Sequence, residues 1–112
     1  MIPYDSQYVN NEPAYVINGL KFICTCDACP EQYDVIYTSQ DKNSYIVGYV
    51  RLRYGKLTCE FPDVGGKLIY KHDFFDHMGW LGVFPTEQIR LEHLTKITDA
   101  IMDILKGVAN GS

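Results

Sequence analysis

Hydrophobic and polar residues alternate most regularly between positions 45 and 53. This period of two is typical of a strand that has one face against a core and the other face away from it. Tyr54 and Gly55 follow as a two-residue turn, in which glycine supplies the positive φ, and Lys56–Phe61 has the composition of a returning strand. The pattern therefore predicts a β-hairpin over residues 45–61.

The register of this hairpin follows from pairing Arg53 with Lys56 across the turn. One face then carries residues suited to a core, namely Ile46, Gly48, Val50, Leu52, Leu57, Cys59 and Phe61. The other face carries mostly tyrosines, arginines and polar partners, namely Tyr45, Val47, Tyr49, Arg51, Arg53, Thr58 and Glu60. A shift of one residue would mix the two sets, so this register is strongly favoured. We expect Phe61 to lie opposite the strand glycine, Gly48, and to cover it.

Shorter runs rich in β-forming residues lie on both sides of the hairpin. They predict strands over Ala14–Ile17, Leu20–Thr25, Tyr33–Thr38 and Lys67–Lys71, with a short additional strand over Leu81–Phe84. Asn18 and Gly19 supply a turn between the first two of these strands.

The C-terminal segment changes to helical spacing. Thr86 is a suitable N-cap, Glu87 suits the positive end of the helix dipole, and Gly107 is a natural stop. An apolar stripe runs between them, formed by Leu91, Leu94, Ile97, Ile101, Ile104, Leu105 and Val108. The predicted fold is therefore α+β, with an antiparallel meander of four to five strands and one C-terminal amphipathic helix packed on one face. Residues 1–13 are expected to form an irregular arm, and residues 14–112 a single domain.

Composition narrows the classes of function. The chain has 112 residues and a net charge of −4, without the basic surplus that most nucleic-acid-binding domains carry. No apolar run approaches the roughly 20 residues that a membrane span needs, and the first residues lack the pattern of a signal peptide. We therefore expect a soluble cytoplasmic protein. An exposed edge strand, either the first strand or the one at 67–71, could pair with a second copy.

Two clusters could hold a metal. Cys24, Cys26 and Cys29 form a C-x-C-x-x-C sequence, and with Cys59 they would suit structural zinc. We favour the alternative that these cysteines are reduced and structural, with no cofactor, because Cys59 already has a core position in the hairpin. The segment His72–His77 places His and Asp on both sides of two phenylalanines. It could bind a divalent ion, but no known metal-binding spacing is present, and we favour a solvated loop that its phenylalanines anchor to the core.

The sequence does not favour an enzyme. Cys29 has acidic neighbours, Asp27 and Glu31, which raise a thiol pKa rather than lower it. No nucleophile-elbow, phosphate-binding or dinucleotide-binding motif is present.

The polar face of the hairpin is the stronger candidate site. Tyrosine and arginine are over-represented at the centres of protein interfaces. The predicted contact residues are Tyr45, Tyr49, Arg51, Arg53, Glu60 and Trp80. The same residue types would also suit stacking on single-stranded nucleic acid. The simplest alternative is an ordinary solvent face whose tyrosines serve strand formation.

Three stretches carry a resemblance to known proteins. They are Cys26–Val35, Val47–Gly55 and Phe61–Gly66. In them the chain resembles small uncharacterised proteins of bacteriophages and mobile elements. The resemblance implies a bacterial cytoplasmic setting and brings no catalytic residues. In that setting, a non-enzymatic inhibitor of a host defence complex, of the anti-CRISPR kind, is the function we predict, with a host or phage protein as its partner.

Overall fold

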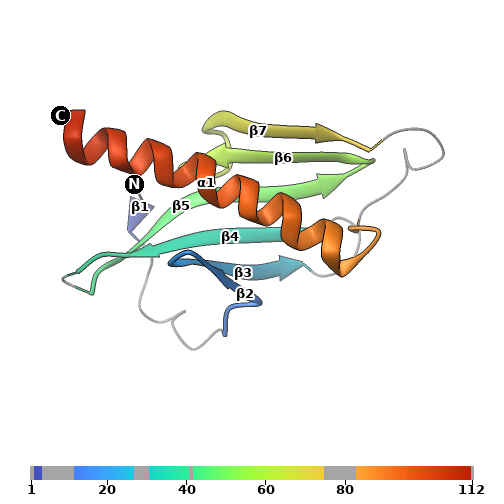
Figure 1. Cartoon of the computed structure of the whole chain (residues 1–112), viewed down its shortest axis with the longest axis horizontal. Helices are drawn as coiled ribbons and strands as arrows, with labels where there is room; N and C mark the ends of the chain where they lie inside the picture. Colours follow the sequence, from blue (N-terminus) through green and yellow to red (C-terminus); the bar gives the residue numbers. More distant parts are fainter. Residues whose placement is uncertain (1, 4–11, 27–30, 41, 75–82, 112) are drawn as a thin grey trace.

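The fold is an antiparallel sheet with one long helix on one face (Figure 1). The computed structural model describes residues 2–3, 12–26, 31–40, 42–74 and 83–111. The elements are β1 (Ile2–Pro3), β2 (Tyr15–Ile17), β3 (Leu20–Cys26), β4 (Glu31–Thr38), β5 (Ser44–Arg53), β6 (Lys56–Phe61), β7 (Lys67–Asp73) and α1 (Glu87–Gly111). This confirms the α+β class, the antiparallel sheet and the C-terminal helix.

The sheet is larger than the four to five strands expected. Its described strands follow the order β2-β3-β4-β5-β6-β7, and β1 pairs with β5. Each predicted run from residue 14 to residue 71 forms a strand of its own. Ile2 and Pro3, within the predicted N-terminal arm, pair with Ile46 and Tyr45. Val83 and Phe84 are not in a strand, and the rest of the short strand expected there lies outside the described residues.

The hairpin formed by β5 and β6 has the predicted register. Its five Cα pairs are Tyr49–Glu60, Val50–Cys59, Arg51–Thr58, Leu52–Leu57 and Arg53–Lys56. Tyr54 and Gly55 both have positive φ in the turn, at 52° and 73°. This backbone twist suits a two-residue hairpin loop.

A β-bulge in β5 changes which side chains share a face. Val35 of β4 pairs with Gly48, but the next residue, Ile36, pairs with Ile46, so Val47 is an extra residue. Val47 is fully buried and Tyr45 packs against the core, on the side where α1 lies. The alternation predicted over 45–53 therefore holds only from Gly48 onward, because a bulge reverses the faces before it.

The core fills the space between α1 and the sheet. Its fully buried members include Leu20, Phe22, Val35, Val47, Val50, Leu52, Leu57, Cys59, Leu94, Ile97 and Ile101. Gly48 lies beneath the helix, where an added Cβ would be 2.9 Å from Cδ1 of Ile101. The described pairs of β5 and β6 end at Tyr49–Glu60, and the side-chain atom nearest to a Cβ added at Gly48 belongs to Ile101 of the helix.

The helix begins as predicted and ends later. The Ile89 amide donates to Oγ1 of Thr86 over 3.1 Å, which confirms the N-cap. The helix then continues for 25 residues to Gly111. Gly107 does not end it, because the residue is not among the glycines with the positive φ that a glycine cap requires. The described helix is not long and apolar enough to cross a membrane.

Two glycine substitutions test this packing. We expect Gly48→Ala to lower the free energy of unfolding by about 1–3 kcal/mol, because its methyl group overlaps the Ile101 side chain. The matched control is Gly107→Ala, where nothing lies within 4 Å of the added Cβ. That change should raise stability by about 0.5–1 kcal/mol, because alanine favours the helix. Urea unfolding of the full chain measures both, and equal effects would contradict the packing of α1 over Gly48.

Candidate functional site

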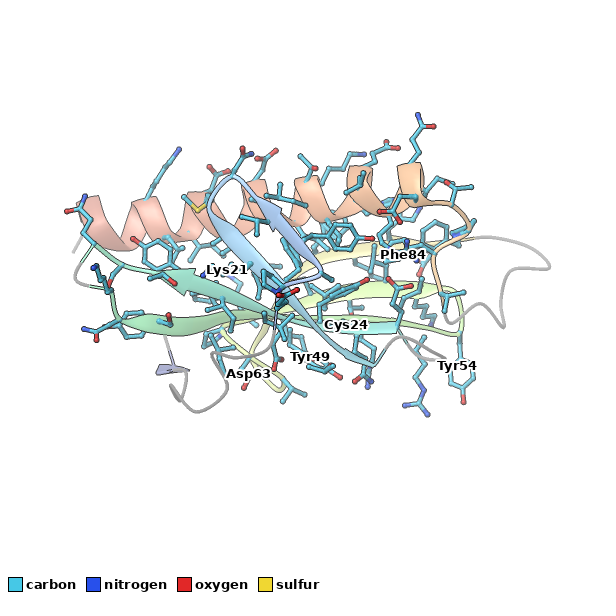
Figure 2. All side chains as sticks on the ribbon, turned by 90° about the horizontal axis from the view of Figure 1, so that it is seen from below. Lys21, Cys24, Tyr49, Tyr54, Asp63 and Phe84 are labelled. Carbon is cyan, nitrogen blue, oxygen red and sulfur yellow. The ribbon has the colours of Figure 1, made fainter. Side chains whose placement is uncertain are left out.

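The face of the sheet opposite α1, called here the helix-free face, has its side chains in rows set by the strand register. The row through Tyr49 crosses five strands and contains Ile23, Asp34, Tyr49, Glu60 and Leu68. The adjacent row contains Gln32, Arg51, Thr58 and Lys71. Figure 2 shows Tyr49 and Asp63 on the side of the sheet away from the helix. Directly opposed side chains in neighbouring strands lie about 4.5–5.5 Å apart at Cβ, so each row forms a continuous strip.

Tyr49 is half-buried between two carboxylates. Asp34 is its partner on β4 and Glu60 is its partner on β6. The pKa of Asp34 is raised, first by burial and second by the negative charge of Asp63. Asp63 belongs to the turn between β6 and β7, in which its carbonyl accepts the Gly66 amide over 2.9 Å. The surroundings of Tyr49 are therefore acidic and partly withdrawn from water.

The predicted contact residues are not all together. Tyr49, Arg51 and Glu60 share the helix-free face, and Arg53 lies at the hairpin end with its guanidinium 5.0 Å from the centre of the Tyr54 ring. Tyr45 lies on the other side of the sheet, because the bulge at Val47 reverses its direction. Trp80 lies outside the described residues.

Sequence reasoning missed Asp34, Asp63 and two isoleucines on this face. Ile23 and Ile36 are only 7% and 2% exposed, yet they are not part of the core beneath α1. The alternation in β4, where Tyr33 and Val35 face the core, was the signal that placed Asp34 and Ile36 on the opposite side. Nothing in the local sequence brings Asp63 near them.

The other side of the sheet contains a buried ion pair. Glu31 is 3% exposed, and its two carboxylate oxygens accept from Nε and Nη2 of Arg90 over 2.8 and 3.0 Å. The Tyr33 hydroxyl also donates to Glu31 over 2.6 Å, and the Phe84 amide donates over 3.3 Å. Hydrogen bonds to Glu31 raise the pKa of Arg90, while burial raises the pKa of Tyr33. These bonds fix the start of α1 on the sheet, which is a structural role.

A second polar group lies where α1 meets β7. His93 is 6% exposed, and its Nδ1 is 2.7 Å from the hydroxyl of Tyr70. The ring of His72 lies 4.4 Å from that of His93, centroid to centroid. The pKa of His93 is lowered, first by burial and then by the charges of His72 and Lys96. His72 and Asp73 belong to β7, and residues 75–77 of the predicted metal loop lie outside the described residues.

The strand order separates two of the four cysteines. Cys24 is on β3 and Cys59 on β6, with β4 and β5 between them. Three strand spacings of about 4.8 Å place them roughly 14 Å apart, too far for one zinc ion. Burial raises the pKa of Cys59 to about 12, so it is a protonated core thiol. Zinc bound by Cys24 with Cys26 and Cys29 stays a prediction, because Cys29 and the Cys26 side chain lie outside the description.

Comparison with known proteins adds no relative: no family model, no curated protein and no solved structure matches the chain.

The ion pair beneath α1 gives a stability prediction. Arg90→Ala leaves the Glu31 carboxylate buried without its cation, so unfolding free energy should fall by about 3–5 kcal/mol. The control is Lys96→Ala, which breaks an exposed pair with Glu92 and should cost about 0.5 kcal/mol or less. Chemical unfolding at neutral pH measures both changes. Similar losses in the two variants would contradict a structural role for the Glu31–Arg90 pair.

His93 gives a pH prediction. The pKa of His93 in the folded protein lies below the ordinary value of 6.5. As the pH falls through 6.5, the unfolded chain therefore takes up a proton at this histidine before the folded protein does. The His93 contribution to stability is therefore fully present above pH 6.5 and is lost as the pH falls through that value toward the folded pKa. We expect His93→Phe to flatten the stability curve between pH 7.5 and about 5 relative to the parent chain. Parallel curves for the two proteins would count against this assignment.

Proposed function

We propose that this protein is a non-enzymatic protein-binding domain whose partner contacts the helix-free face at Tyr49. The observation that carries the proposal is the position of Tyr49: half-buried, in the middle strands of the sheet, on the face that α1 leaves uncovered. Tyrosines at such central, partly desolvated positions are frequent hot spots of protein interfaces.

The composition of the surrounding strip supports a protein as the partner. Tyr49 has polar and charged neighbours in its own row and in the adjacent row, together with the exposed Leu68 at the margin. A mixed surface of this kind, with an aromatic centre and a polar rim, resembles the anatomy of specific interfaces. The carboxylates beside Tyr49 would repel phosphates, so a single-stranded nucleic acid suits this face less well.

The polar groups described on the opposite side of the sheet already form bonds within the protein. Glu31 and Arg90 bind each other and neighbouring groups, and His93 is bonded to Tyr70. They hold the helix in place, which favours the helix-free face as the site of function.

The sequence resemblance gives this binding domain a setting. In a bacteriophage or mobile element, a small acidic domain of this kind would act by occupying a functional surface of a host complex. We therefore include in the proposal that the domain is an inhibitor of a host defence complex in the bacterial cytoplasm.

Two tyrosine substitutions in one hairpin test the binding face. The affinity-tagged full chain is used to recover partners from a bacterial lysate, and each recovered partner is then titrated against purified variants. Tyr49→Ala should weaken binding by about 30-fold, which corresponds to a hot spot of about 2 kcal/mol. The matched control is Tyr54→Ala, which removes a 65% exposed ring at the hairpin turn and should change binding less than about twofold.

Thermal unfolding of both variants separates loss of contact from loss of fold. A folded Tyr49→Ala protein that binds its partner as tightly as the parent would overturn the proposed binding face.

A further inference from the structure

The surroundings of Tyr49 suggest what chemistry the partner presents. Asp34, Tyr49 and Glu60 are successive members of one row on β4, β5 and β6, so a carboxylate stands on each side of the ring. Asp63 reaches the same area from the β6–β7 turn, close enough for its charge to raise the pKa of Asp34. In Figure 2, Asp63 and Tyr49 both lie on the face away from α1. Two acidic side chains thus flank the ring, and a third lies near Asp34.

These carboxylates have no cation of their own within the described part of the chain. The ion pairs there join Arg90 to Glu31 and Glu87, and Lys96 to Glu92. Arg51 and Lys71 lie in the adjacent row, and neither forms an ion pair with Asp34, Glu60 or Asp63. A cationic side chain from a partner would therefore meet carboxylates that have no ion-pair partner among the described residues.

Folding places Asp34 where its charged form is disfavoured. Asp34 is half-buried beside the apolar Ile23, and both burial and the neighbouring Asp63 disfavour its charged form. A group whose pKa is raised on folding stabilises the fold only when protonated, and that contribution is lost as the pH rises. At neutral pH an asparagine in this place should make the fold at least as stable. Residues that oppose stability in this way are characteristic of binding sites.

We infer that the Tyr49 site takes a cationic side chain of the partner, with arginine preferred over lysine. Its aliphatic part lies on the tyrosine ring, and its charged end lies among the carboxylates of Asp34, Glu60 and Asp63. Arginine fits better because its planar guanidinium stacks on aromatic rings and binds carboxylates through paired hydrogen bonds. The inference rests on the proposed function, since it names the chemistry of the partner at the same face.

The direct experiment uses short peptides as probes of the full-length, ¹⁵N-labelled chain. Acetyl-Gly-Arg-Gly-amide, its lysine analogue and its neutral citrulline analogue are each titrated while amide shifts are recorded. We expect saturable shifts at Asp34, Tyr49 and Glu60 with arginine, weaker binding with lysine, and none with citrulline. Raising the salt from about 20 to about 300 mM should weaken the arginine complex at least threefold, because the attraction is electrostatic. Calcium chloride, titrated separately, should not reproduce the shifts, because a tyrosine ring adds nothing to a metal site.

Two variants that each remove one carboxylate provide the matched test. Asp34→Asn should weaken binding of the arginine peptide at least threefold. The melting temperature of this variant should equal that of the parent or rise. Glu92→Gln removes the same charge from the exposed face of α1, and it should leave peptide binding unchanged. The inference would be overturned if the citrulline peptide bound as tightly as the arginine peptide, or if the shifts were confined to other amides. Equal effects of the two variants, or stronger binding of calcium, would also overturn it.

The same variants keep this inference separate from the proposed function. A captured partner that needs Tyr49 but binds Asp34→Asn and the parent equally would reject the cationic side chain and keep the binding face. A captured partner that binds Tyr49→Ala as tightly as the parent would reject both the cationic side chain and the binding face.

Discussion

The ion pair between Glu31 and Arg90 is the contact on which the arrangement of this protein depends. It joins residues 59 positions apart, one at the start of β4 and the other in the first turns of α1. A buried carboxylate requires nearly all of its hydrogen-bonding capacity to be met, and here a guanidinium, a tyrosine hydroxyl and a backbone amide meet it. Because these partners come from separate elements, the pair fixes where the helix begins on the sheet.

The position of the helix divides the sheet into two chemically different faces. Beneath α1, the apolar side chains are buried, and Arg90 neutralises the one buried carboxylate on β4. On the opposite face, Asp34 occupies the same strand but has Asp63 as its charged neighbour. The two carboxylates, three positions apart, therefore lie in opposite surroundings. Glu31 is bound to a cation, whereas burial and the charge of Asp63 disfavour the charged form of Asp34.

Local signals were sufficient for the elements that depend on near neighbours in the chain. The register of the β5–β6 hairpin and the Thr86 cap each involve residues that are close in sequence, so pattern and turn chemistry predicted them. The bulge at Val47 was not predictable in the same way, because it depends on how β4 pairs with β5. The close approach of Ile101 to Gly48 was not predictable from the hairpin either, because it comes from the helix.

The sequence by itself determined that Tyr49, Arg51 and Glu60 share one face, because alternation and a two-residue turn leave no other register for that hairpin. Only the tertiary structure decided that Tyr45 leaves that face, that Asp34 lies beside Tyr49 and that Asp63 lies near Asp34. These placements depend on strand pairing and on the path of a turn between strands. Such contacts join parts of the chain that carry no mutual signal in their local patterns.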